Sequence, residues 1–172
     1  MTKSLFITDS EPVPPITPYG NTKRAIEIML ADYEVATGMR NTVLRYFNAA
    51  GCDADGEIGE VHDPETHLTP LAIATAAGDR EALKIFGTDY PTPDGTCIRD
   101  YIHVVDLAKA HVMAVNHILN KSKIKTANNL GVGKGVSVRE VVNSFEKVNK
   151  LKISYELGPR RAGDVEKIYS DN

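Results

Sequence analysis

The sequence is poor in cysteine, in charge of one sign and in long apolar runs. Its only cysteines are Cys52 and Cys97, with no Cys-x-x-Cys pair, so a disulfide framework is excluded and a reducing, cytoplasmic setting is favoured. Twenty lysine and arginine residues stand against 23 aspartate and glutamate residues without a basic run, which argues against a nucleic-acid binder. No apolar run is long enough to span a membrane, and residues 1–9 lack a signal peptide's basic start and apolar core.

Two kinds of ligand motif are also missing. A dinucleotide-binding fold carries Gly-x-Gly-x-x-Gly after its first strand, and no such turn precedes Tyr19. The run Gly131-Val132-Gly133-Lys134-Gly135 fits neither that fingerprint nor the phosphate loop of the nucleotide hydrolases, so we interpret it as a tight turn. His62 and His67 frame an acidic loop, but no further ligand has metal spacing, and we predict no metal site.

Helical and strand patterns alternate along the 172 residues, which predicts an α/β fold. Residues 1–16 are rich in proline and are expected to form a surface loop, as are residues 49–68. Thr69 is expected to cap the second helix, and Ser137 with Glu140 forms a capping box before the last one. Helices are expected over 18–37, 69–77, 106–119 and 138–148, and strands over 41–48, 83–87, 98–105, 127–130 and 152–157.

Tyr19 and Lys23 stand four residues apart at the start of the first helix. Pro18 suits a first helical turn, and the i, i+4 spacing puts both side chains on one face. A lysine ammonium near a phenol stabilises the phenolate, which suits proton exchange with a substrate hydroxyl. The alternative is an exposed helix start without a catalytic role.

Polar residues also mark three later segments. Arg45-Tyr46-Phe47-Asn48 closes a strand, at the edge where open α/β sheets bind ligands, although both aromatics could belong to the core. Arg99, in an apolar strand, needs an anion, either the neighbouring Asp100 or a ligand phosphate. Pro159-Arg160-Arg161-Ala162-Gly163-Asp164 offers two guanidinium groups and a carboxylate to a nucleotide, or is a solvated loop.

These segments together resemble a known family. The spelling Pro-Tyr-Gly-Asn-Thr-Lys before an amphipathic helix is similar to the active-site helix of the extended short-chain dehydrogenases that act on nucleotide sugars. The order and spacing of all the segments resemble those of the UDP-glucose 4-epimerases over nearly all of residues 12–172. The segments are Tyr19-Gly-Asn-Thr-Lys23, Leu44-Arg-Tyr-Phe-Asn48, Ile85-Phe-Gly-Thr-Asp-Tyr90, Arg99-Asp-Tyr-Ile-His103-Val-Val-Asp106 and Pro159-Arg-Arg-Ala-Gly-Asp164.

The resemblance implies roles for ten residues. Tyr19 would be the catalytic acid/base, and Lys23 would activate it and bind the nicotinamide ribose of NAD. Tyr46 and Phe47 would flank the nicotinamide. The substrate contacts would come from Asn48 and Arg99 at the diphosphate, Leu68 and Phe86 in the uridine pocket, Arg161 at a phosphate and Asp164 at the uridine ribose. His67 and Cys97 stand where the family usually has asparagine and glycine, so neither receives a role.

The implied fold is a partial Rossmann-type fold with the smaller C-terminal substrate-binding domain. Residues 1–60 would be a remnant of the NAD-binding domain, and residues 61–172 mostly the nucleotide-sugar domain, truncated at its C-terminus. The implied reaction interconverts UDP-glucose and UDP-galactose through a 4-keto sugar, in galactose metabolism. The implied partners are a UDP-sugar, NAD, a second copy joined through the Tyr19 helix and a missing N-terminal half, without which the chain would be inactive.

Three other interpretations remain. A nucleotide-sugar dehydratase or decarboxylase of the same superfamily would need a further acid/base group. The chain could also be a non-catalytic UDP-sugar-binding fragment or an assembly module. The resemblance implies that the position of Ile168 bears on specificity for plain or N-acetylated hexose, and an aliphatic residue there is ambiguous.

Overall fold

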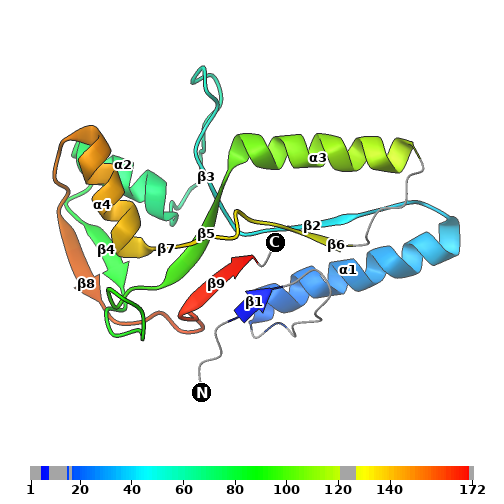
Figure 1. Ribbon diagram of the computed structural model, residues 1–172, viewed down its shortest axis with the longest axis horizontal. Coiled ribbons are helices and arrows are strands. Elements are labelled where there is room, and N and C mark those ends of the chain that lie inside the picture. Colours follow the sequence, from blue (N-terminus) through cyan, green and yellow to red (C-terminus); the bar gives the residue numbers. More distant parts are fainter. Residues whose placement is uncertain (1–4, 8–14, 16, 121–126, 171–172) are drawn as a thin grey trace.

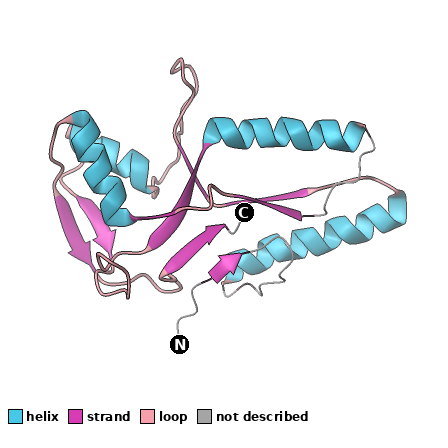
Figure 2. Cartoon of the chain, viewed as in Figure 1, coloured by secondary structure: helices cyan, strands magenta, loops and turns pink. Residues whose placement is uncertain are grey.

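The computed structural model describes residues 5–7, 15, 17–120 and 127–170. Two groups of elements lie on either side of β5 (Figure 1). One group holds α2, α4, β4 and β8, and the other holds the long helices α1 and α3 with β2 and β6 between them (Figure 2). The elements are β1 Leu5–Ile7, α1 Pro18–Thr37, β2 Val43–Tyr46, β3 Asn48–Ala50, α2 Leu68–Ala77, β4 Leu83–Phe86, β5 Ile98–His103, α3 Val104–Leu119, β6 Ala127–Leu130, β7 Gly135–Ser137, α4 Val138–Asn149, β8 Tyr155–Gly158 and β9 Lys167–Ser170.

The strands form one five-stranded sheet and two pairs. The sheet has the order β1-β9-β5-β3, with β7 also paired to β5, while β2 pairs with β6 and β4 with β8. All these pairings are parallel except that of β5 with β7. Parallel strands joined through helices are the signature of α/β folds, so the predicted fold class is confirmed.

The best-buried apolar core lies beneath α2 and α4. Ala72 and Val142, one from each helix, pack with Leu83 and Ile85 of β4 and with Ile153. Leu83 and Ile85 alternate with the exposed Lys84, as expected of a strand with one face on a core. This core fixes β4 and the start of α2, two of the elements that line the pocket described below.

Local capping signals placed two helices as predicted. The Thr17 side chain accepts a hydrogen bond from the Gly20 N–H (3.1 Å), and Gly38 ends α1 in the left-handed region (φ 73°). At α4 the Ser137 hydroxyl accepts from the Glu140 N–H (3.0 Å), and the Glu140 carboxylate accepts from the Ser137 N–H (2.8 Å). The predicted capping box is therefore confirmed.

Other expected boundaries were wrong. The second helix begins at Leu68, with His67 rather than Thr69 at its N-cap position. The third begins at Val104 rather than at Asp106, because the His103 ring accepts a hydrogen bond from the Val105 N–H (3.2 Å) and so caps it. The last expected strand, 152–157, is β8 at Tyr155–Gly158.

Strands β1, β7 and β9 were not expected, and β3 (Asn48–Ala50) extends into residues 49–68, which were expected to form a loop. The expected loop over residues 1–16 contains β1 at Leu5–Ile7, parallel to β9 at Lys167–Ser170. Strands β1 and β9 each have a partner about 160 residues away in sequence, which a local pattern cannot reveal. The rest of residues 1–14 lies outside the described residues.

The long helices expose apolar surface. In the described chain α1 has no buried residue, and its exposed side chains include Ile26, Met29 and Tyr33. On α3, Leu107 is buried, whereas Val112 and Val115 are exposed, as are Ala108 and His111. Strand β2 is only partly buried, and its Tyr46 is exposed.

Candidate functional site

A pocket of about 250 Å³ lies between the end of the five-stranded sheet and the core beneath α2. Five of the six residues expected to bind substrate line it, although they are spread over more than 110 positions in sequence. They come from β3, the start of α2, β4, β5 and the loop after β8, and they are Asn48, Leu68, Phe86, Arg99 and Arg161. The fold therefore places five residues that are distant in sequence around one pocket.

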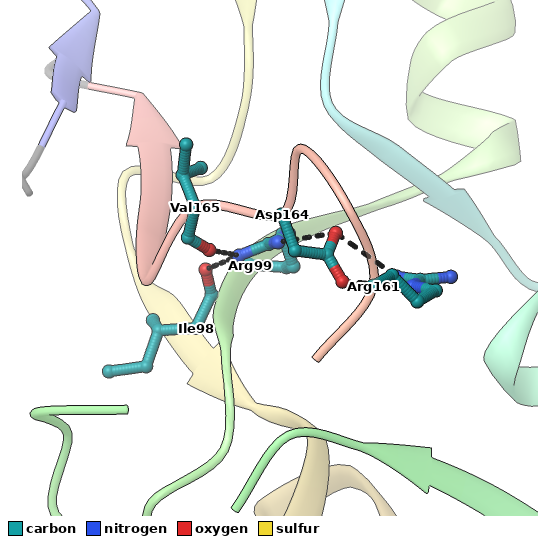
Figure 3. A network of polar contacts seen from close by, with 5 residues as sticks. All are labelled: Ile98, Arg99, Arg161, Asp164 and Val165. Carbon is teal, nitrogen blue, oxygen red and sulfur yellow. Dashed lines mark hydrogen bonds and ion pairs between the residues drawn. The ribbon is translucent and has the colours of Figure 1, made fainter. Parts of the chain in front are cut away.

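The sixth residue, Asp164, lies between the two arginines (Figure 3). Its Oδ1 atom accepts from Arg99 Nη2 (3.4 Å) and Arg161 Nη2 (3.3 Å), and its Oδ2 atom accepts from Arg161 Nε (2.8 Å). The hydrogen bonds to the Asp164 carboxylate raise the pKa of Arg161, which keeps it charged. Two guanidinium charges against one carboxylate leave a net positive charge at the pocket, which suits an anionic ligand.

Both arginines keep hydrogen-bond donors beyond these bonds. Arg99 Nη1 donates to the carbonyl oxygens of Ile98 and Val165, each at 2.9 Å (Figure 3). With the bond to Asp164, three of its five N–H groups are used. Arg161 gives two of its five to Asp164 and places its guanidinium carbon 5.2 Å from the centre of the Phe86 ring. The remaining donors are those that a phosphate oxygen would take.

The alternative pairing of Arg99 with Asp100 was wrong. Neighbouring residues of a strand point to opposite faces, and the Asp100 side chain is fully buried on the other side. Its carboxylate accepts from the N–H groups of Val132 (2.9 Å), Gly133 (3.0 Å) and Ser170 (3.2 Å). The Asp100 carboxylate thus accepts hydrogen bonds from backbone N–H groups, and the carboxylate partner of Arg99 is Asp164.

A second pocket, of about 330 Å³, adjoins the first through two shared residues, Asn48 and Arg99. Tyr46 and Phe47, expected beside the nicotinamide, line it together with Ile168, the residue expected to bear on sugar specificity. Tyr46 is 55% exposed, so the alternative interpretation of Tyr46 as a core aromatic was wrong.

Tyr19 and Lys23 lie on one face of α1, with the Lys23 ammonium 5.0 Å from the centre of the Tyr19 ring. They line neither of these two pockets, and Tyr19 is 72% exposed. The start of α1 nevertheless adjoins the loop of Arg161 and Asp164. A Cβ atom added at Gly163 would lie 3.6 Å from Thr17 Cγ2, so the Thr17 cap packs against that loop two residues before Tyr19.

Four titratable side chains that received no role from the sequence also line the first pocket. They are His67, Lys84, Cys97 and Tyr101. Strand alternation could have found two of them, because Lys84 is two residues from Phe86 and Tyr101 is two residues from Arg99. Burial raises the pKa of Tyr101, so its phenol stays neutral at the pocket wall.

The fold is a parallel α/β architecture, the class to which Rossmann-type folds belong, and two arginines lie at one pocket at the end of its sheet. Comparison with known families makes this specific: the model of the NAD dependent epimerase/dehydratase family matches residues 5–131. The chain therefore belongs to the NAD dependent epimerase/dehydratase family.

Curated and solved relatives agree with this assignment. UDP-glucose 4-epimerase of Rhizobium meliloti (strain 1021) is 50% identical over 169 residues, which are 98% of this chain and 51% of that protein. The structure of UDP-glucose 4-epimerase from Brucella ovis in complex with NAD is 52% identical, with a TM-score of 0.91 over 99% of this chain and 52% of its own.

A second solved relative was determined with both NAD+ and UDP. The structure of UDP-glucose 4-epimerase from Bifidobacterium longum in complex with NAD+ and UDP is 39% identical, with a TM-score of 0.82 over 99% of this chain and 51% of its own. The chain thus spans about half the length of the relatives it matches. In the described residues, no helix is both long and apolar enough to cross a membrane.

Proposed function

We propose that this chain binds a UDP-sugar in the pocket of Arg99 and Arg161 and contributes the acid/base pair of an NAD-dependent UDP-glucose 4-epimerase. The observation that carries the proposal is the convergence of Asn48, Leu68, Phe86, Arg99 and Arg161 on one pocket. A nucleoside diphosphate needs cationic donors at one end and apolar surface at the other, and this pocket offers both.

The diphosphate would lie against the donors that Asp164 leaves to the two arginines. Asp164 holds both guanidinium groups in place, and its carboxylate is also suited to accept a ribose hydroxyl. Leu68 and Phe86 would cover the uracil ring. The Arg161 guanidinium is already 5.2 Å from the Phe86 ring, so one side chain links the two ends of the pocket.

Tyr19 would exchange the proton of the sugar 4-hydroxyl, and Lys23 would stabilise the phenolate from one helical turn away. The nearby Thr17–Gly163 contact supports a position of this pair at the edge of the diphosphate site. Tyr46 and Phe47 would hold the nicotinamide end of NAD beside the same pocket. NAD, when bound, supplies the reversible hydride acceptor that 4-epimerisation requires.

The residues of this chain fit the nicotinamide end of NAD, in that two aromatic side chains line a pocket that adjoins the substrate pocket. The 172 residues contain no Gly-x-Gly-x-x-Gly turn for the pyrophosphate. We therefore propose that these residues bind UDP but do not retain NAD or epimerise by themselves. Mass spectrometry of the purified chain under non-denaturing conditions tests whether NAD is retained, because bound NAD would add its mass to that of the chain.

We also propose a homodimer through the α1 surface and a cytoplasmic location. The exposed apolar side chains of α1 support the first. The two free cysteines, Cys52 and Cys97, support the second because a reducing compartment keeps thiols unpaired. The division at residue 60 into a cofactor part and a substrate part is likewise a proposal.

The test is UDP affinity measured by calorimetry on the 172-residue chain. A charge-assisted contact contributes about 1.5–3 kcal/mol, so Arg99→Ala and Arg161→Ala should each weaken UDP binding about ten- to a hundredfold. Arg160→Ala is the matched control, because Arg160 is next in sequence but pairs with Asp89 outside the pocket (2.7 Å). Equal affinity in the parent and both pocket variants would disprove the proposed site.

A further inference from the structure

Beside the pocket, the loop before α2 gathers two histidines and a glutamate. His62, Glu65 and His67 each place one possible ligand atom so that all three lie within 4.8 Å of one another. Glu65 Oε1 is 3.0 Å from His67 Nδ1 and 3.8 Å from His62 Nδ1. Residue spacing gives no third ligand for the two histidines, and the turn at residues 62–67 supplies Glu65.

The two separations from Glu65 Oε1 are close to those between ligands of a tetrahedral metal site. Zinc binds imidazole nitrogen and carboxylate oxygen at about 2.0–2.2 Å, so two ligands of a tetrahedron lie about 3.3–3.6 Å apart. The two measured distances to Glu65 Oε1 fall on either side of that range. A metal ion could therefore enter with ligand shifts of a few tenths of an ångström at those two contacts.

The charge and the orientation of the cluster also suit a dication. Glu60 places a second carboxylate oxygen 2.6 Å from His67 Nδ1, so two carboxylates surround the two imidazoles. Glu65 is held in place by the N–H groups of Thr66 (2.6 Å) and His67 (2.7 Å), which donate to its Oε1 atom. Hydrogen bonds of this kind orient ligands in metal sites.

We propose that His62, Glu65 and His67 form a divalent transition-metal site of the zinc class, with one open coordination position, beside the pocket of Arg99 and Arg161. Thr66 and His67 line that pocket, so a metal on His67 stands at its wall. Three protein ligands with an open fourth position is the pattern of zinc sites that take up a further ligand. The inference does not depend on the identity of the sugar nucleotide.

Zinc binding by the chelator-treated chain, measured by competition with a chromophoric chelator, tests the site. We expect one Zn²⁺ per chain and an affinity about tenfold or more weaker in each of His62→Gln, Glu65→Gln and His67→Gln. His117→Gln is the control, because His117 is exposed near the end of α3. Circular dichroism verifies that each variant is folded, and zinc affinity unchanged in all three ligand variants would overturn the site.

Cobalt gives a second readout that does not rely on affinity. Co²⁺ at this site should show the intense visible absorption of tetrahedral coordination, which the Glu65→Gln variant should lose. Added azide should shift those bands by taking the open position. A Co²⁺ spectrum with only weak octahedral bands would overturn the tetrahedral site, and bands insensitive to azide would overturn the open position.

Discussion

Asp100 is a buried carboxylate that ties together three parts of the chain. It belongs to β5 and accepts N–H groups from the turn at Val132 and Gly133 and from Ser170 of β9. By holding β9 and the turn against β5, it positions the strand that carries Arg99. Its role is structural, and its side chain lies on the opposite face of β5 from Arg99, which lines the pocket.

Replacing Asp100 should therefore cost stability. Asp100→Asn leaves at least one buried N–H facing an amide N–H₂ group, so we expect the free energy of unfolding to fall by about 3 kcal/mol. Urea denaturation measures this change. Asp106→Asn is the control, because Asp106 is an exposed residue paired with Lys109 and its loss should cost less than about 1 kcal/mol. Similar losses in the two variants would contradict the role of Asp100.

Tyr90 should make the fold sensitive to alkali. Burial, with the neighbouring Cys97, raises the pKa of Tyr90 to about 12. A phenol with a pKa higher in the folded chain than its usual value of about 10 stabilises folding fully below pH 10. That contribution is lost as the pH rises from about 10 to about 12.

The expected result is a free energy of unfolding that falls less steeply above pH 10 in Tyr90→Phe than in the parent. Denaturation at a series of alkaline pH values gives both slopes. Tyr155→Phe, at an exposed position of β8, should keep the parent slope. A parent slope retained by Tyr90→Phe would show that Tyr90 does not set the alkaline limit and would point to Tyr101, whose pKa is also raised by burial.

At the scale of elements, α1 is a capped helix that presents Tyr19 and Lys23 one turn apart. The proposed acid/base role can be tested in a chimera in which this chain replaces the matching half of the Rhizobium meliloti epimerase. There Tyr19→Phe should lower turnover of UDP-galactose about 10²- to 10⁴-fold, because general acid–base catalysis contributes that much. UDP affinity should not change.

Tyr33→Phe is the matched control, since Tyr33 lies on the same helix and is exposed. It should leave turnover unchanged. If Tyr19→Phe turns over substrate at the parent rate, Tyr19 is no part of the mechanism. If instead both variants lose turnover equally, the defect lies in the helix and not in the phenol.

The uncovered face of α1 predicts self-association of the 172-residue chain. Met29 is 68% exposed, with Ile26 and Tyr33 exposed three and four residues away on the same side. A charge placed there should oppose the burial of this face, so Met29→Glu should lower the association constant in sedimentation equilibrium by about tenfold or more. Val61→Glu, on the exposed loop after β3, is the control. An unchanged constant in Met29→Glu would place the contact elsewhere.

Elements with local signals could be predicted from the sequence, and those without could not. Thr17 with Pro18, Gly38, and the Ser137–Glu140 box each fix a helix end within a few residues, so their helices were found. Strands β1 and β9 stabilise each other across most of the chain. Their short sequences carry no turn or alternation signal, so only the assembled fold reveals them.

At the scale of the whole molecule, residue types could be predicted more readily than their partners. The sequence marked Arg99 and Arg161 as cations in need of an anion, and the structure places both at one pocket. It could not show that Asp164 holds them together, because that contact joins β5 to a loop 65 residues later. Nor could it show Glu65 beside both histidines, since that contact depends on the turn before α2.

We propose a nucleoside-diphosphate site in this chain between the five-stranded sheet and α2. A crystal structure of the 172-residue chain grown with UDP tests it most directly. We predict diphosphate oxygens within hydrogen-bond distance of the Arg99 and Arg161 guanidinium groups, and the uracil ring against Leu68 and Phe86. UDP bound elsewhere on the chain, or an empty pocket at saturating UDP, would contradict the account.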